Sequence, residues 1–313
     1  MRDPLVSIVV PLYNKEEWVS QTLLTVYNQT YSNWECLIID DGSIDRSLEI
    51  VNEFTKGHPG NWKIISQANL GQTHARNLGI DEASGEFIAF LDADDLWLPR
   101  KIELHMEAHL LNPDLGLSLT SYVIFKEGQK KYFRLVSSGN SKKMINNWFN
   151  MTGFGGLIES TGFLKKEILE KFGKYSESFS MTAGLDLSLK IISELQVVTL
   201  KEPLVLYRLS PGQFHKNEDV LVRDLVLMNE KHARSAGNLE HLQRLHASYL
   251  YWSNCRKKGV AYFFFAALKS IVSLNWQKLP MIYSLISRNV VALSRGFIQR
   301  NKFREFLNDF TVK

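Results

Sequence analysis

Short apolar runs alternate along the first hundred residues with segments whose apolar residues recur at helical spacing. Runs rich in Val and Ile are typical of buried strands, and they predict strands at residues 6–12, 34–39, 62–66 and 87–91. The intervening segments predict helices at residues 16–28, from about residue 45 through Phe54, and at 73–83. This alternation predicts an α/β fold in which a mostly parallel central sheet is flanked by helices.

The middle of the chain has a different pattern. It predicts strands at 115–125 and 131–136, a loop and strand at 151–162, a helix at 184–194, and a strand at 197–209 that Pro203 interrupts. Beyond about residue 218, every long segment is compatible with helix. We therefore expect one α/β domain over residues 1–215 and an appended C-terminal helical region over residues 216–313.

Polar residues directly follow three of the predicted strands. They are Tyr13-Asn14, Asp40-Asp41 and Asp92-Ala93-Asp94. In open α/β sheets, ligands bind beyond the carboxyl ends of the strands. These residues are therefore expected to line one ligand site.

The acidic run LDADD at residues 91–95 is the strongest of these features. Side chains two apart on an extended segment point the same way, so Asp92 and Asp94 are expected to converge. Carboxylates suit Mg²⁺ or Mn²⁺, and a cation held here could neutralise charge on a leaving diphosphate. A helix cap is the weaker alternative because the next helix is expected to start at Pro99. A salt bridge within the loop remains open.

The second motif is DDGS at residues 40–43. A carboxylate at a strand end can accept hydrogen bonds from a base or from ribose hydroxyls. The alternative is a cap for the next helix, a common role of Asp and Ser. We expect both, with Ser43 or Asp45 as the cap and Asp41 left free for a ligand.

The third motif is NLGQTHARN at residues 69–77. Gly71 permits close approach of the backbone to a ligand. Arg76 lies on the following predicted helix, where it could face phosphates or pair with a carboxylate of the acidic run. The residues alone leave these two alternatives open.

Composition narrows the class of protein further. The 313 residues are 45% apolar and 22% charged, the balance of a globular protein. Two cysteines far apart predict neither a disulfide framework nor a cysteine metal cluster, and they fit a reducing cytosol. The turn after the first strand, PLYN, lacks the glycines of a dinucleotide site or a phosphate loop. Motifs of GxSxG hydrolases and HExxH zinc enzymes are also absent from the sequence.

Charge is distributed unevenly along the chain. Residues 221–313 contain 15 Lys and Arg against 5 Asp and Glu, whereas residues 1–220 contain 22 against 28. The basic run at 256–258 precedes an aromatic and apolar segment at 259–265, which suits an anionic membrane surface. Alternatively, these aromatics pack inward between helices. We expect no nucleic-acid partner, because no reading motif accompanies the charge, and neither a signal peptide nor a transmembrane helix.

Four motifs together carry a resemblance to a known family. They are VVPLYN at 9–14, DDGS at 40–43, NLG through ARN at 69–77, and LDADD at 91–95. In this order they resemble the successive motifs of family 2 glycosyltransferases, densely over residues 5–105 and more thinly to about residue 215. The resemblance implies a GT-A fold and transfer of a sugar, with inversion, from a nucleoside diphosphate donor such as a UDP-sugar.

The resemblance also implies roles for individual residues. By similarity, the nucleotide-sugar would be bound by Pro11, Tyr13, Glu16, Asp41, Asn69, Arg76 and Asp92, and a divalent metal, Mn²⁺ or Mg²⁺, by Asp94. The acceptor would be a hydroxyl of a glycan or of a lipid-linked molecule in surface polysaccharide assembly. Such an enzyme would be cytoplasmic and, if it binds lipid, peripheral on the inner face of the plasma membrane.

The general base is where this sequence departs from the family pattern. Family members commonly carry a Glu-Asp pair, but the corresponding residues here are Ala183-Gly184. Asp186 is the acid within this window and is the expected base, with Glu159 and Glu177 as the alternatives. A chain without a working base would instead be a nucleotide-sugar-binding protein with weak or no transfer activity.

Overall fold

The computed structural model describes residues 3–126, 134–136, 159–180 and 182–209, together with residues 220, 223, 224, 227 and 231. All of them belong to the first of two compact units, Met1–Leu242, and the second unit is Gln243–Lys313. The predicted domain boundary at residue 215 and nearly all of the predicted helical region lie outside the described residues. Both therefore stay predictions.

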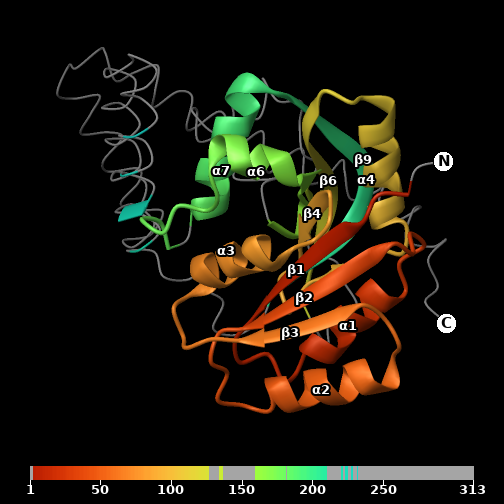
Figure 1. Cartoon of the computed structure of the whole chain (residues 1–313), viewed down its shortest axis with the longest axis vertical. Helices are drawn as coiled ribbons and strands as arrows, with labels where there is room; N and C mark the ends of the chain where they lie inside the picture. Colours follow the sequence, from red (N-terminus) through yellow and green to blue (C-terminus); the bar gives the residue numbers. More distant parts are fainter. Residues whose placement is uncertain are drawn as a thin grey trace, which may run out of the picture. The chain divides into compact units, whose positions relative to one another are not determined.

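Four parallel strands form the first half of the sheet, in the order β3-β2-β1-β4 (Figure 1). They are β1 Val6–Leu12, β2 Trp34–Asp40, β3 Trp62–Ser66 and β4 Phe87–Phe90. Their connections contain the helices α1 Val19–Tyr27, α2 Ser47–Gly57 and α3 Gln72–Glu82. Every residue of β1 and β2 is buried, which is why these strands are mainly continuous apolar runs. The predicted alternation of strand and helix is confirmed here.

The second half of the sheet is mixed. β8 (Phe163–Lys165) pairs antiparallel with β4 and with β6 (Leu115–Phe125), and β6 pairs parallel with β9 (Gln196–Arg208). The short strands β5 (Leu96–Trp97) and β7 (Arg134–Val136) pair antiparallel with β9 and β6, respectively. The sequence predicts β6 and β9, and it predicts a strand at 131–136 that includes β7. It does not predict β5 and β8, whose two and three residues carry no periodic signal of their own.

Two local details differ from the predicted pattern. Pro203 does not interrupt β9: the strand continues through it, and the register with β6 shifts beside Ser121. Proline cannot donate to the ladder, so an irregularity at this point lets the pairing resume beyond it. Residues Glu159–Thr161 form a short 3₁₀ helix, η1, inside the segment where a loop and strand are predicted. Residues 151–158 lie outside the described residues.

Helices pack on both faces of the sheet. Apolar residues of α1, α2 and α4 (Lys101–Leu111) share one core with alternate residues of β1. On the other face (Figure 1), α3 approaches β1 so closely that a Cβ on Gly79 would lie 2.3 Å from the Val9 side chain. α6 (Lys166–Phe172) packs against α7 (Ala183–Glu194), which also contacts β6. Within the described residues, helices with the length and hydropathy to cross a membrane are absent.

Candidate functional site

The loops that follow β1, β2 and β4 meet at one edge of the sheet. Leu12 pairs with Asp40 in the parallel register, and the Asp41 N–H donates to the Leu12 carbonyl at 2.8 Å. The Leu91 N–H donates to the Val9 carbonyl at 3.0 Å. The polar residues beyond the three strands are therefore neighbours.

The loop after β1 is hydrogen-bonded to the loop after β2. The N–H of Asn14, whose φ is 50°, donates to Ser43 Oγ at 3.1 Å, and the Ile44 N–H donates to Asn14 Oδ1 at 2.9 Å. The Lys15 N–H donates to Ser47 Oγ at 2.6 Å. Asparagine tolerates a left-handed backbone because its short polar side chain bonds locally. Asn14 thus joins the two loops and sets the position of Lys15.

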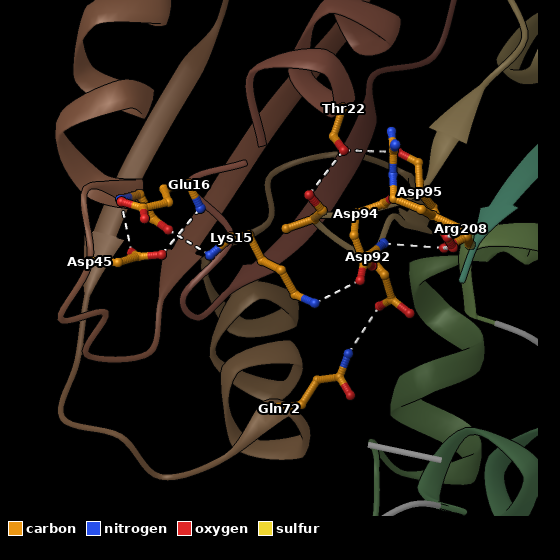
Figure 2. Close-up of polar contacts among 12 residues, drawn as sticks. Lys15, Glu16, Thr22, Asp45, Gln72, Asp92, Asp94, Asp95 and Arg208 are labelled. Atoms are coloured by element: carbon orange, nitrogen blue, oxygen red, sulfur yellow. Dashed lines mark hydrogen bonds and ion pairs between the residues drawn. The ribbon is translucent and has the colours of Figure 1, made fainter. Parts of the chain in front are cut away.

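Glu16 is exposed and belongs to the same network (Figure 2). Its carboxylate accepts a hydrogen bond from the Arg46 N–H at 2.9 Å, and its own N–H donates to Asp45 Oδ2 at 3.2 Å. Asp45 Oδ1 accepts from the N–H of Ser47, the first residue of α2, at 2.9 Å. Burial by itself raises the pKa of Asp45, but the hydrogen bonds to its carboxylate outweigh this effect and lower the pKa. Of the two predicted caps, Asp45 is the one that contacts the start of α2.

Three other residues predicted to bind the nucleotide-sugar lie at this edge. Pro11 is buried in β1 opposite Ile39, and Tyr13 follows the strand with 42% of its surface exposed. Asn69 is exposed in the loop before α3. A Cβ on Gly42, whose φ is 72°, would lie 3.0 Å from the Asn69 nitrogen, so glycine lets the two loops approach. Their role in binding stays a prediction.

Asp41 is 3% exposed and holds the loop that precedes α3. Its Oδ1 accepts hydrogen bonds from Gln67 Nε2 at 2.7 Å and from the Leu70 N–H at 2.8 Å, and its Oδ2 accepts one from the Gly71 N–H at 2.9 Å. The expectation that this carboxylate is free is therefore wrong. A carboxylate offers about four lone-pair sites, so Oδ2 can still accept one further hydrogen bond.

Arg76 and Asp92 form a largely buried ion pair in the site. Arg76 Nη2 donates to Asp92 Oδ1 at 2.6 Å. Gln72 Nε2 donates to the same oxygen at 3.0 Å (Figure 2). The Arg76 side chain is 4% exposed and lies 5.6 Å from the centre of the Tyr175 ring. Burial by itself lowers the pKa of Arg76, but the charges of Glu159 and Asp92 outweigh this effect and raise it. Of the two alternatives that the sequence leaves open for Arg76, the structure shows the pairing with a carboxylate.

Asp94 faces Lys15 across the site (Figure 2). Lys15 Nζ lies 2.6 Å from Asp94 Oδ2, and the two side chains are 24% and 9% exposed. Among the described residues, no cluster of three His, Cys, Asp or Glu could hold a metal by itself. Mg²⁺ is usually held by one or two carboxylates while substrate phosphates and water complete its shell. The carboxylate of Asp94 therefore fits Mg²⁺ or Mn²⁺, provided that the cation displaces the Lys15 ammonium.

Asp95 stabilises the site, although the sequence alone did not single it out. It is fully buried; Oδ2 accepts from Ser160 Oγ at 2.6 Å, and Oδ1 accepts from the Arg208 N–H at 3.1 Å. Arg208 Nε in turn donates to the Asp94 carbonyl at 2.8 Å (Figure 2). Burial raises the pKa of Asp95 well above its usual value, and the nearby Asp92 and Asp94 raise it further. Asp95 thus fixes the acidic turn to η1 and to the end of β9.

Asp186, the expected base, lies in the first turn of α7 and is fully buried. Its Oδ2 lies 3.1 Å from the Nζ of Lys190 and 3.1 Å from the Nζ of Lys231. Lys190 is one turn further along the same helix, and Lys231 belongs to a later segment of the chain. Both ammonium groups thus form ion pairs with this carboxylate. Its catalytic role stays a prediction.

Glu159 lies beside the position where the family's acidic pair is missing. A Cβ on Gly184 would lie 2.2 Å from Glu159 Oε1, so the carboxylate fills the space of a side chain at that position. The Glu159 side chain is 20% exposed, and its Oε1 lies 3.5 Å from Arg76 Nη1. Burial raises the pKa of Glu159. The charge of Arg76 lowers this pKa and the charge of Asp92 raises it, and the pKa remains raised overall. Glu177, the other alternative, is exposed in the loop before α7.

Residues 7–173 match the model of the family described as glycosyl transferase family 2. The match covers more than half of the 313 residues. The chain therefore belongs to this family, and the predicted family is confirmed.

Known proteins place this membership in context. The UDP-Glc:alpha-D-GlcNAc-diphosphoundecaprenol beta-1,3-glucosyltransferase WfgD of Escherichia coli is 41% identical over 112 residues, 36% of this chain and 44% of that protein. The crystal structure of S. aureus TarS 1–349 with UDP-GlcNAc matches with a TM-score of 0.61 and 18% identity, over 88% of this chain and 78% of that one. The Pyrobaculum calidifontis mannosyltransferase PcManGT, in complex with GDP-Man and Mn²⁺, matches with a TM-score of 0.59 and 16% identity, over 95% and 88%.

The structural matches and the sequence matches support different conclusions. The two structural matches show that the fold is the GT-A fold of glycosyltransferases. The chain spans about half or less of the length of these curated relatives.

Proposed function

We propose that this chain is an inverting glycosyltransferase that moves a sugar from a nucleoside diphosphate donor, with a UDP-sugar as the first candidate. The observation that carries the proposal is the convergence of Asp41, Arg76, Asp92 and Asp94 at one edge of the sheet. Membership of family 2 supports the reaction class. The UDP-GlcNAc complex of TarS, which shares the fold, supports the donor class.

The nucleoside is proposed to lie over the loops that follow β1, β2 and β3. Asp41 Oδ2 has one acceptor site left for the N–H of a base. The half-exposed ring of Tyr13 offers a face for stacking, while Pro11 and Asn69 bound the same space. Glu16 contributes by tying the loop after β1 to the start of α2.

The diphosphate and the sugar are proposed to lie toward Arg76, Asp92 and Asp94. Arg76 would favour anionic oxygens and keep Asp92 in place for the sugar hydroxyls. Asp94 would hold Mn²⁺ or Mg²⁺, a role supported by its carboxylate chemistry and by the Mn²⁺ in the PcManGT complex. A divalent cation bound there would stabilise the negative charge of the leaving diphosphate.

Transfer then requires an acceptor hydroxyl to attack the anomeric carbon from the face opposite the leaving group. The transition state has oxocarbenium character, and the negative charge of Asp92 beside the sugar would stabilise it. A carboxylate has to accept the proton of the hydroxyl. The sequence assigns this role to Asp186.

The acceptor is proposed to be a hydroxyl of a glycan or a lipid-linked molecule in surface polysaccharide assembly. The name of the E. coli relative, which includes a GlcNAc-diphosphoundecaprenol acceptor, supports the lipid-linked class. A cytoplasmic protein that contacts the inner face of an anionic membrane would meet such an acceptor. The sequence feature behind this location, at residues 256–265, lies outside the described residues.

Calorimetry tests the donor site first. UDP should bind the full chain, and Mn²⁺ should strengthen the binding. UDP release from a panel of sugar nucleotides, with GlcNAc-diphosphoundecaprenol as acceptor, then tests transfer. A chain that does not bind UDP, with or without Mn²⁺, would contradict the proposal.

The second candidate function is nucleotide-sugar binding with weak or no transfer. The observation that favours it is the pair Ala183-Gly184 in place of two acids, together with the pairing of Asp186 to two lysines. The same assays separate the candidates, because this alternative predicts UDP binding without release of UDP from any donor.

A further inference from the structure

We infer that Glu159, rather than Asp186, is the general base that deprotonates the acceptor hydroxyl. This assignment rests on the proposed transferase function and names a residue for its proton transfer. A base must be a carboxylate inside the site, within reach of an entering hydroxyl, and not held by a lysine or by the backbone of another residue. Glu159 meets these conditions among the acids that the structure describes.

The other acids of the site are held by fixed partners. Asp41 accepts three hydrogen bonds from the loop before α3. Asp94 pairs with Lys15, and the fully buried Asp186 pairs with two lysines. Asp95 is fully buried and accepts bonds from Ser160 and the backbone of Arg208. Each of these carboxylates therefore has a structural task that a proton would disrupt.

Asp92 needs separate consideration because it lies close to Glu159. It forms the short ion pair with Arg76 at 2.6 Å and also accepts a hydrogen bond from Gln72. Glu159 is 3.5 Å from the same guanidinium, at the edge of ion-pair distance. Arg76 thus makes its shorter hydrogen bond to Asp92, which also accepts one from Gln72, while the charge of Glu159 acts on Arg76 from the longer distance.

The position of Glu159 gives the assignment its geometry. A Cβ on Gly184 would lie 2.2 Å from Glu159 Oε1. A side chain at position 184 and the Glu159 carboxylate would therefore occupy the same space. Gly184 lies in the first turn of α7. The carboxylate that the sequence lacks at residues 183–184 is therefore supplied in space by η1, from a position 25 residues earlier in the chain.

The surroundings of Glu159 suit a base. It borders a cavity of about 30 Å³ whose other walls are mostly apolar, including Phe90, Leu187 and Ile191. An apolar wall disfavours the charged form, which agrees with the raised pKa of Glu159. A carboxylate whose pKa is raised is a stronger proton acceptor than an ordinary one. One-fifth of its side-chain surface remains accessible to an entering hydroxyl.

The acceptor oxygen forms a bond to the anomeric carbon while its proton passes to a carboxylate oxygen of Glu159. The bond from the anomeric carbon to the diphosphate oxygen breaks, and its electron pair leaves with the nucleoside diphosphate. Glu159 ends neutral beside Arg76, and it returns its proton to solvent before the next turnover.

The first test replaces Glu159 by its neutral isostere. In the full chain, Glu159→Gln should reduce the rate of UDP release from the active donor by about 10²–10⁴-fold, the usual contribution of a general base. Affinity for UDP with Mn²⁺ should stay within about threefold of the wild type, because the base does not contact the nucleotide. Glu170→Gln, on the exposed surface of α6, is the matched control and should retain wild-type turnover.

A relocation variant covers the possibility that Glu159→Gln disturbs folding. Glu159→Ala opens the space beside Gly184, and adding Gly184→Asp should return a carboxylate to it. An acid in the first turn of a helix is also compatible with the helix dipole. The double variant should release UDP at least about tenfold faster than Glu159→Ala alone. Gly184→Asp by itself places two acids in one space and should be the least stable of the set.

Three outcomes are decisive. An active wild type with a nearly unchanged Glu159→Gln rate would overturn the assignment and leave the proposed function standing. Loss of turnover in Asp186→Asn together with retention in Glu159→Gln would return the role to Asp186. A wild-type chain that binds UDP but turns over no donor would overturn the proposed function, and this assignment with it.

Discussion

Lys15 occupies the position from which a cation would neutralise Asp94. Its ammonium is 2.6 Å from the carboxylate, and the backbone of Lys15 is fixed by Ser47 at the start of α2. A divalent cation would have to displace this ammonium before it could reach Asp94. The two cations therefore compete for one carboxylate.

This competition predicts the effect of Lys15→Met. An ion pair of this partly exposed kind contributes about 1 kcal/mol, so the variant should reach half-saturation at a Mn²⁺ concentration roughly fivefold lower. The measurement is UDP affinity as a function of Mn²⁺. Lys63→Met is the matched control, because Lys63 pairs with Glu82 on the surface. Weaker UDP binding in the absence of metal would show instead that Lys15 serves the phosphates.

Asp94 carries the complementary prediction. Asp94→Asn should abolish the strengthening of UDP binding by Mn²⁺ and reduce turnover by at least about a hundredfold, because the leaving diphosphate loses its counter-charge. Removal of divalent metal with a chelator should have the same effect on the wild type. Asp81→Asn changes a surface acid that pairs with Lys174, and it should behave as the wild type. Full turnover in Asp94→Asn would refute the metal role of this residue.

Single residues also show where sequence reasoning reaches its limit. Asp41, Arg76 and Asp92 could be picked out because each sits at a strand end or a helix start, and chain order brings such positions to one edge. The partners of Asp41 could not be foreseen, since they depend on the course of the loop before α3. Glu159 meets Gly184 through a tertiary contact for which local patterns provide no signal.

At the scale of elements, α4 presents a buried polar cluster to the sheet. His105 Nδ1 and His109 Nε2 lie 2.7 and 3.0 Å from Ser118 Oγ in β6. Lys101 is fully buried, with its Nζ 4.2 Å from the centre of the Trp97 ring. Burial lowers the pKa of Lys101 from 10.5 to about 7 and that of His109 from 6.5 to about 4, and it holds the pKa of His105 well below the usual value. The cluster is therefore neutral when the fold is most stable.

The cluster predicts how stability depends on pH. Between pH 4 and 6.5 the unfolded chain binds protons that folded His109 does not, and between pH 7 and 10.5 the same holds for Lys101. The free energy of unfolding should rise with pH across both windows, by at most about 1.4 kcal/mol per pH unit for each group. Urea unfolding followed by tryptophan fluorescence at pH 5, 6.5, 7.5 and 9 measures this.

Lys101→Met isolates one of the two windows. Methionine keeps the length of the buried stem and removes the amine, so stability should become nearly flat between pH 7.5 and 9 while the acidic slope remains. The urea midpoints of the variant and the wild type provide the comparison. An unchanged slope above pH 7 would mean that Lys101 is not neutral in the folded chain.

The elements differ in how far the sequence determined them. The spans of β1, β3 and β6 match the predicted residues. β1 and most of β6 are buried, and buried apolar runs have few other ways to exclude water, whereas β3 lies at an edge of the sheet and is only partly buried. β5 exists because Leu96 and Trp97 pair with β9, more than a hundred residues later. No local pattern encodes such a pairing, and the same holds for β8 between β4 and β6.

At the scale of the whole molecule, acidic and basic residues are distributed unevenly along the sequence. The first 220 residues carry more acids than bases, and residues 221–313 carry 15 basic residues against 5 acidic ones. The acids of the first part include those at the proposed metal and sugar site, where they have a chemical use. The basic excess has no such use in the proposed transfer, which favours a separate anionic partner.

The basic run Arg256-Lys257-Lys258 beside the aromatic segment 259–265 leads to the prediction for the whole chain. Each basic residue near an anionic bilayer contributes about 1 kcal/mol. The full chain should therefore sediment with vesicles containing phosphatidylglycerol at low salt, and it should be released at about 0.5 M NaCl, where the Debye length is shorter than 8 Å. Replacing the three basic residues by Gln should weaken binding roughly a hundredfold, since about 3 kcal/mol is lost.

Two controls separate this surface attraction from other causes. Neutral phosphatidylcholine vesicles should not bind the chain, and replacement of Lys56, Lys63 and Lys171 in the first unit removes the same charge elsewhere and should leave binding unchanged. A membrane that concentrates a lipid-linked acceptor would also lower the acceptor concentration needed for turnover. The Gln variant should therefore need more acceptor than the wild type in vesicles, and the same amount as the wild type in detergent. Equal binding to neutral and anionic vesicles would mean that the aromatic segment acts without the charges, and no binding at low salt would remove the membrane from the proposal altogether.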